Sequence, residues 1–291
     1  MDQRIADLLT LLELEPLEVN LFRGESRDIG SPQVFGGQVL GQALMAASRT
    51  VERRLVHSLH AYFLRRGDFT APIVYEVDRS RDGQSFSNRR VIAIQHGEQI
   101  FNMTASFQVI QPGLEHQIPI PAVPPPESLA DSSRVHPELL ARLPEPVQRL
   151  LATPRPFEFR SVQPLSRLSR SAPVRQIWFR AVSSVPDDQT LQRCLLAYVS
   201  DFYLLETATL PHGISSLSGK AIVASIDHAM WFHRPLRVDD WLLYAVESPS
   251  ASGARGFARA SVFARDGRLV ASTAQEGLVR LVSESSQAHH D

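Results

Sequence analysis

The chain has 291 residues, of which 43% are hydrophobic and 21% are charged. These proportions are typical of a folded globular protein and exclude a disordered or fibrous chain. The formal net charge of −1 gives no electrostatic reason to expect a nucleic acid or an anionic membrane as a partner, and the single cysteine, Cys194, excludes an internal disulfide framework and a cysteine-rich zinc site.

The chain opens on MDQRIADLLTLLELEP, in which charged residues regularly interrupt the apolar ones. This spacing predicts an amphipathic helix and lacks the uninterrupted apolar core of a signal peptide. No apolar run approaches the roughly 18–20 residues that span a bilayer as a helix. We therefore expect a cytoplasmic protein that has no membrane as a partner.

Two long helical segments follow, each ahead of a series of strands. The first is GGQVLGQALMAASRTV at 36–51, and the second is DQTLQRCLLAYVSDFYLLETA at 188–208, where Asp188 is a suitable N-cap. Alternating segments come after each helix and are separated by turn signals such as HGEQ and RDGR. The pattern predicts an antiparallel sheet wrapped around one apolar helix, twice in the chain, which is an α+β architecture.

A proline-rich segment separates the two halves. Eleven of the 20 prolines fall between Pro112 and Pro156, a density at which strands and long helices do not persist. Only one short helix is expected there, around PELLARLP at 137–144. The predicted organisation is an N-terminal half at 1–112, a linker at 113–156, a C-terminal half at 157–285 and a tail at 286–291.

The two halves also resemble each other in sequence. LVHSLHAYFLRR at 55–66 aligns with VASIDHAMWFHR at 223–234, and the alignment matches His60 to His228. Each block precedes a similar series of hairpins. The chain is therefore interpreted as two copies of one helix-and-sheet unit.

Several common catalytic motifs are missing from the sequence. There is no G-x-S-x-G nucleophile elbow, and GISSLSGK at 213–220 is not a phosphate loop, because Ala221 replaces the required Ser or Thr. FGGQVLGQAL lacks the glycine spacing of a dinucleotide site. His57 and His60 lie three residues apart on a predicted strand, which points them to opposite faces and argues against a metal site.

Asp201 is the unusual residue of the second predicted helix. It lies in CLLAYVSDFYLL, where every other residue except Ser200 is apolar. Burying an unpaired carboxylate costs several kcal/mol or more. Two interpretations are open: a structural carboxylate that pairs with a loop or an arginine, and a functional base.

Polar residues on two later strands favour the functional interpretation. By the period of two along a strand, Ser225 shares a face with Asp227, whereas His228 lies on the opposite face; Gln275 belongs to a later strand. A carboxylate, a hydroxyl and an amide that converge on one buried point could hold a water, with Asp201 accepting its proton and the other two orienting it. That constellation suits hydrolysis of an activated acyl compound.

Long blocks over nearly the whole chain closely resemble the acyl-CoA thioesterase II family. In chain order they are LFRGESRDIGSPQVFGGQVLGQAL, RLVHSLHAYFLRRGD, RDGQSFSNRRVIAIQ, MTASFQ, SIDHAMWFHRP, WLLYAVESPSASGARGF and DGRLVASTAQEG. The resemblance is weakest in the proline-rich linker. It implies a double hotdog fold, in which two antiparallel sheets each wrap around a long central helix. It also implies hydrolysis of fatty acyl-CoA to free fatty acid and CoA, without a metal or redox cofactor.

The resemblance also implies the site residues. The family's catalytic aspartate, hydroxyl residue and glutamine fall by motif on Asp201, Ser225 and Gln275. Bacterial members often carry threonine at the position of Ser225, so the oxygen is retained here while the methyl group that would restrict its rotamer is not. We expect activity to survive this difference, with a changed rate or chain-length preference.

Two mechanisms are compatible with these residues. In the first, Asp201 deprotonates a water that attacks the thioester carbonyl, and backbone N–H groups around Gly36 and Gly37 stabilise the oxyanion. In the second, Ser225 is a covalent nucleophile that forms an acyl-enzyme. His57 is a possible accessory residue in either case.

Two other classes of function compete with a thioesterase. A hotdog hydratase would act on enoyl-CoA through an Asp227–His228 pair, although strand alternation separates these two side chains. A non-catalytic module would bind acyl-CoA without turnover. The resemblance further implies a homo-oligomer with acyl-CoA as its substrate, and no nucleic acid partner is expected.

Overall fold

The computed structural model describes residues 1–132, 145–163, 170–214 and 221–282. The short helix predicted at 137–144 lies outside the described residues. The N-terminal amphipathic helix is confirmed as α1 (Gln3–Leu12), which the side chain of Asp2 caps by accepting the Arg4 N–H at 2.9 Å. Its apolar stripe, which includes Ile5 and Leu8, is buried. No helix in the described part of the chain is long and apolar enough to cross a membrane.

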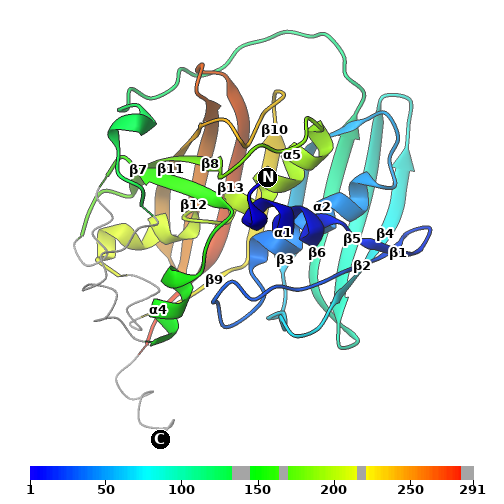
Figure 1. Cartoon of the computed structure of the whole chain (residues 1–291), viewed down its shortest axis with the longest axis horizontal. Coiled ribbons are helices and arrows are strands. Elements are labelled where there is room, and N and C mark those ends of the chain that lie inside the picture. The colour runs from blue at the N-terminus through cyan, green and yellow to red at the C-terminus, as the bar shows by residue number, and fades with distance from the viewer. Residues whose placement is uncertain (133–144, 164–169, 215–220, 283–291) are drawn as a thin grey trace, which may run out of the picture.

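Antiparallel strands of both halves join into one sheet of 13 strands (Figure 1). The path runs β1-β2-β4-β5-β6-β3-β10-β13-β12-β11-β8-β7, and β9 pairs with β13 beside it. The first half supplies β1 (Glu15–Glu18), β2 (Leu21–Gly24), β3 (Leu55–Phe63), β4 (Ile73–Asp82), β5 (Phe86–Gln95) and β6 (Glu98–Gln108). The second half supplies β7 (Phe157–Ser161), β8 (Val174–Ala181), β9 (Ala221–Ser225), β10 (Asp227–Phe232), β11 (Leu242–Ser252), β12 (Arg255–Ala264) and β13 (Leu269–Leu281).

The two halves meet along β3 and β10, whose backbones pair directly. His60 stands opposite Ala229, and Ala61 stands opposite His228. The sequence alignment matches His60 to His228, but the structure places His60 on the exposed face and buries His228 completely. The two histidines are therefore equivalent in sequence and opposite in orientation.

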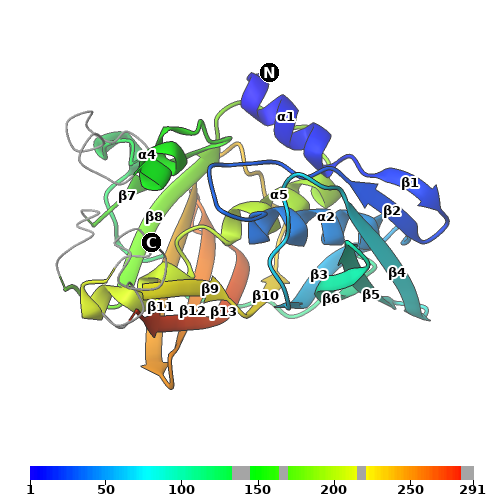
Figure 2. The ribbon, with the colours of Figure 1, turned by 90° about the horizontal axis from the view of Figure 1, so that it is seen from below.

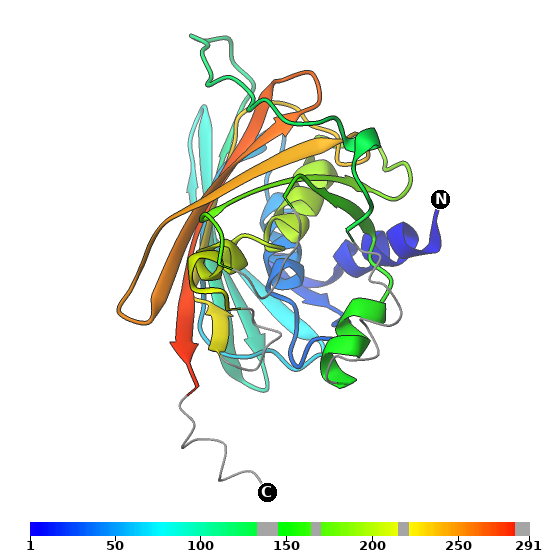
Figure 3. The ribbon, with the colours of Figure 1, turned by 90° about the vertical axis from the view of Figure 1, so that its left-hand side faces the viewer.

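Two helices, α2 (Gly36–Ser48) and α5 (Gln189–Ser200), pack against each other inside the curve of the sheet (Figures 2 and 3). Their close approach depends on glycines of α2. A Cβ atom at Gly37 would overlap the carbonyl oxygen of Tyr198, and one at Gly41 would lie 3.2 Å from that of Cys194. The glycines of the first half therefore let its helix lie directly against the backbone of the second.

The second helix is shorter than the predicted segment 188–208. Asp188 caps its start as expected, accepting the Thr190 N–H at 2.7 Å. The α-helix ends at Ser200, so Asp201 is its C-cap and not a residue of its middle. Tyr203 then adopts a left-handed conformation, with φ of 64°, and the chain continues as a 3₁₀-helix, η2 (Leu205–His212). The positive φ of Tyr203 is incompatible with a right-handed α-helix, so α5 does not continue through this residue into η2.

The proline-rich segment runs along the second half. Residues 113–125 form neither helix nor strand, and a short 3₁₀-helix, η1 (Pro126–Ser128), follows them. The segment is held by specific contacts: Trp178 Nε1 donates to the Pro124 carbonyl oxygen at 2.9 Å, and Gln117 Nε2 donates to that of Gly267 at 2.8 Å. A helix that the sequence analysis did not predict, α4 (Glu145–Ala152), comes before β7.

Candidate active site at the junction of the two halves

The three residues proposed from the sequence lie together in the structure. Asp201 follows α5, Ser225 is the last residue of β9, and Gln275 lies in the middle of β13. Gln275 Nε2 is 2.8 Å from Asp201 Oδ1 and 3.0 Å from Ser225 Oγ. The amide of Gln275 therefore connects the carboxylate on the helix to the hydroxyl on the neighbouring strand.

The first half of the chain contributes the start of α2 to this site. The Gly37 N–H donates a hydrogen bond to the Asp201 carboxylate. A Cβ atom at Gly36 would lie only 2.7 Å from Asp201 Oδ2, so this position leaves no room for a side chain. The N–H groups at a helix start carry partial positive charge, which favours a carboxylate there. One of the two proposed oxyanion donors is thus engaged with Asp201 instead.

A β-bulge turns Ser225 toward the interior. Ser225 stands opposite Gly277, and Ala229 stands opposite Ala274, so four steps along one strand match only three along the other. The extra residue lies at the break between β9 and β10, where the Glu276 N–H donates to the Asp227 side chain at 2.6 Å. Such an insertion changes which face the following side chains occupy. The prediction that Ser225 and Asp227 share a face was therefore wrong.

The Asp201 carboxylate is buried, with 6% of its side chain exposed. Burial disfavours the charged form and raises its pKa above the usual value for aspartate, while hydrogen bonds from Gln275, the Gly37 N–H and Ser225 act in the opposite direction. The net direction is upward. A carboxylate with a raised pKa is a better proton acceptor, so this environment suits a general base.

Aromatic rings form the apolar surroundings of the carboxylate. The rings of Phe35 and Phe202 lie with centroids 4.4 Å apart, and Phe35 also contacts Tyr198 edge to face at 5.3 Å. The Phe63 ring borders Gly36, with an edge carbon 3.0 Å from the position of a Cβ atom there. The Phe63 ring beside Gly36 and the Phe35 ring beside Gly37 thus form part of an apolar wall next to the glycines that adjoin Asp201.

His228 is a neighbour of the site that the sequence analysis missed. It is fully buried, and its Nδ1 lies 3.2 Å from Gln275 Nε2 and 3.9 Å from Asp201 Oδ1. Burial lowers its pKa to about 3, so the imidazole is neutral at physiological pH. Strict alternation from Ser225 had placed His228 on the other face, and no feature of the sequence alone marks the bulge that brings the two to one side.

The other proposed residues lie apart from this cluster. His57 Nε2 is 2.8 Å from Ser106 Oγ, and that hydrogen bond joins β3 to β6 within the first half. The Asp227 and His228 side chains point in different directions, since Asp227 is half-buried and His228 is fully buried. The Asp227–His228 pair that the hydratase hypothesis requires is thus not formed. Among the described residues, no group of three or more His, Cys, Asp or Glu is placed to hold a metal ion.

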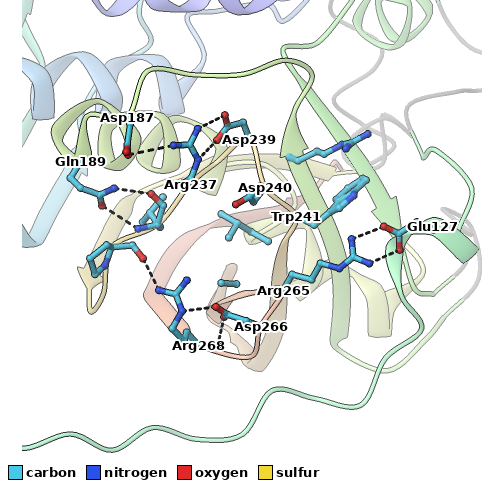
Figure 4. A pocket seen from close by; sticks show the side chains of 15 residues that line it. Glu127, Asp187, Gln189, Arg237, Asp239, Asp240, Trp241, Arg265, Asp266 and Arg268 are labelled. Carbon is cyan, nitrogen blue, oxygen red and sulfur yellow. Dashed lines mark hydrogen bonds and ion pairs between the residues drawn. The ribbon is translucent and has the colours of Figure 1, made fainter.

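A concave region elsewhere, at the edge of the second half, is lined by charged side chains (Figure 4). This cleft has a volume of about 740 Å³ and contains none of the three proposed catalytic residues. Its arginines are paired: Arg265 with Glu127 at 2.6 Å, Arg268 with Asp266 at 2.7 Å. Because these charges are already neutralised in pairs, the cleft offers little net attraction to an anionic ligand.

Comparisons with known proteins identify both halves of the chain. The family model described as acyl-CoA thioesterase matches residues 157–278, and the one described as acyl-CoA thioesterase N-terminal domain matches residues 23–108. The chain is 44% identical to acyl-CoA thioesterase 2 of Haemophilus influenzae over 96% of this chain and 99% of that one. It is 42% identical to human acyl-coenzyme A thioesterase 8 over 99% of this chain and 93% of that one.

The fold is also that of known structures. An acyl-CoA thioesterase II from Mycobacterium marinum superposes with a TM-score of 0.77 and 43% identity, over 96% of this chain and 98% of that one. A hotdog protein from Alicyclobacillus acidocaldarius superposes with a TM-score of 0.78 at 20% identity, over 95% of this chain and 99% of that one, which shows the fold alone. The α+β tandem hotdog fold expected from the sequence is confirmed.

Proposed function

Since the chain belongs to the acyl-CoA thioesterase II family and hydrolyses acyl-CoA, we propose that it cleaves fatty acyl-CoA to free fatty acid and CoA with a water activated by Asp201. Ser225 and Gln275 orient that water. The observation that carries the proposal is the direct hydrogen bonding of Gln275 to both Asp201 and Ser225 in a buried, aromatic-lined site.

The proposed reaction has two steps. Asp201 accepts a proton from water as the water oxygen attacks the thioester carbonyl carbon, which gives a tetrahedral intermediate. The carbon–sulfur bond then breaks, and the CoA sulfur leaves as a thiol after taking a proton from the Asp201 carboxylic acid. The carboxylate is thereby regenerated and the fatty acid is released.

The unsatisfied oxygen of Gln275 supports the orienting role. Gln275 Oε1 is buried and has no hydrogen-bond partner among the described residues. A buried acceptor without a partner costs roughly 1–3 kcal/mol. A water donating one hydrogen to Gln275 Oε1 and the other to Asp201 would remove that cost and point a lone pair at the substrate.

The direct test is Asp201→Asn. Asparagine keeps the shape of the side chain but cannot accept the proton, so we expect kcat for acyl-CoA to fall by about 100-fold or more. The measurement is CoA release over a series of acyl-chain lengths. Asp266→Asn, which alters an exposed aspartate of the charged cleft, is the matched control and should keep wild-type turnover.

Near-normal turnover by Asp201→Asn would sink the assignment of the base. An acyl group found on Ser225 by mass spectrometry after rapid quenching would replace the water mechanism with the covalent one. Hydration of enoyl-CoA without CoA release would instead support a hydratase, and stoichiometric binding without turnover would support a binding module.

Substitutions of Ser225 separate the role of its hydroxyl from that of its size. We expect Ser225→Thr to keep kcat within about threefold, because the oxygen is retained and the added methyl restricts its rotamer. Ser225→Ala should lower kcat by about tenfold or more, the usual effect of losing a hydrogen bond to a charged group. Steady-state kinetics on both variants checks this, and equal activity of the two would show that the hydroxyl has no part in catalysis.

We also propose that the chain forms a homo-oligomer. The outer face of the sheet exposes large apolar side chains, among them Trp231 and Tyr62, and carries a groove of about 620 Å³ that Trp231 helps to line. Exposed apolar surface of this kind is typical of interaction sites. Sedimentation equilibrium should give a mass above that of one 32.4 kDa chain, and a monomer at all concentrations would contradict the proposal.

The cytoplasmic location stays a prediction.

A further inference from the structure

His228 is a buried histidine behind Gln275 that the proposed reaction does not use. It lies on β10, fully shielded from solvent, and each of its ring nitrogens has polar neighbours. Its Nε2 is 3.0 Å from Ser200 Oγ and 3.1 Å from Thr273 Oγ1, while its Nδ1 is 3.2 Å from Gln275 Nε2. The ring thus stands between two hydroxyl groups and the amide of the site.

The hydroxyl groups determine which nitrogen of the ring carries the proton. Ser200 Oγ has the Ala197 carbonyl oxygen at 2.9 Å and Met230 Sδ at 3.4 Å as acceptors for its single hydrogen, and Thr273 Oγ1 has the Ala229 carbonyl oxygen at 2.9 Å. Both hydroxyl oxygens therefore face His228 as acceptors. A neutral imidazole has one donor and one acceptor nitrogen, so Nε2 is the donor and Nδ1 carries the free lone pair.

That lone pair distinguishes the two ends of the Gln275 side chain. Nδ1 can accept a hydrogen bond from the amide nitrogen and would repel the amide oxygen. The nitrogen end is consequently held toward His228, Asp201 and Ser225, and its two hydrogens serve these three neighbours. Oε1 is left on the other side, buried and without a partner among the described residues.

We propose that His228 is a positioning residue, which as the neutral Nε2–H tautomer fixes the Gln275 amide with its nitrogen toward Asp201 and its oxygen toward the reacting water. This inference rests on the proposed function of Asp201 and Gln275. It adds a fourth side chain that touches neither substrate nor water. Ser200 and Thr273 act one step further away, because they select the tautomer.

Loss of the Nδ1 acceptor has a specific consequence. The Gln275 amide can then turn over and place Oε1 against Asp201 Oδ1, where two acceptors repel unless the carboxyl is protonated. The hydrogen bond from Gln275 lowers the pKa of Asp201, so its loss raises that pKa further. Tyr244, which donates to the Ser200 carbonyl oxygen at 2.8 Å, adds no charge nearby because burial raises its pKa well above the usual value.

The tautomer is tested on the wild-type protein by ¹⁵N NMR of its histidine side chains, with the His228 signals assigned by substitution. We expect a neutral ring with the proton on Nε2 and an unprotonated Nδ1 over roughly pH 5–8, the range in which ordinary histidines titrate. An Nδ1–H tautomer or a positively charged imidazole would overturn the inference, and this measurement needs no variant to be active.

The positioning role is tested by two substitutions that each keep one end of the ring. Asparagine places an amide oxygen near the position of Nδ1, so His228→Asn should keep kcat within about threefold. Glutamine reaches the Nε2 position and provides no acceptor near Nδ1. His228→Gln should therefore lower kcat by about tenfold or more, leave KM near the wild-type value, and move the acidic limb of the pH–rate profile to higher pH.

His60→Gln is the matched control, since His60 lies on the adjacent strand with its side chain on the exposed face, and it should behave as wild type. If both His228 variants lose kcat equally and the acidic limb of the pH–rate profile does not move, His228 has a packing role only and the inference is overturned. Full activity of His228→Gln would also overturn it. If His228→Gln does not fold, the inference is tested by the tautomer of His228 in the wild-type protein and by kcat of His228→Asn. Loss of turnover in Asp201→Asn together with full activity of His228→Gln would refute this inference alone.

Discussion

The site depends on one buried charge at the place where the two halves of the chain meet. Asp201 ends the central helix of the second half, and its carboxylate accepts hydrogen bonds from Gln275, from Ser225 and from the Gly37 N–H of the first half. Burial makes the charge unfavourable, and these donors make it tolerable. The balance leaves a carboxylate that gains a proton more readily than usual, which is the property a base requires.

This arrangement explains why two hotdog units occur in one chain. The glycines of α2 let its first turn lie against the backbone of α5, and Gly36 leaves space for the carboxylate itself. The second half alone would supply Asp201 without the helix start that stabilises its carboxylate. The first half alone would supply that helix start without the carboxylate. The pairing of β3 with β10 fixes the two halves in the register that this contact needs.

Much of the fold, and the set of candidate residues that the structure brings together, could be predicted from the sequence. The apolar helices, the hairpins and the cap at Asp188 are encoded by local patterns, and the long blocks of resemblance gave Asp201, Ser225 and Gln275 together. What could not be predicted depends on tertiary geometry. The helix α5 ends at Ser200, and Tyr203 beyond it is left-handed; no short-range pattern in the sequence marks either feature.

The bulge between β9 and β10 likewise could not be predicted from the sequence, and it overturned the assignment of strand side chains to faces. A one-residue insertion reverses the faces of a strand, so a period of two is reliable only within an uninterrupted ladder. Ser225 was assigned to the face of Asp227, and His228 was consequently set aside. Because of the bulge, Ser225 and His228 both reach Gln275. Likewise, the bond from the Gly37 N–H to Asp201 joins residues too far apart in sequence for any local pattern to show.

The most direct measurement of the central claim compares two titrations of the wild-type protein. The pKa of the Asp201 carboxyl is obtained by ¹³C NMR, assigned with Asp201→Asn, and the acidic limb of kcat/KM is obtained from the hydrolysis of acyl-CoA. Because a base must be deprotonated, the account predicts that both midpoints coincide, and that both lie above the ordinary aspartate value of about 3.9. A carboxyl that titrates at or below that value, or a rate limb that does not follow it, would contradict the account.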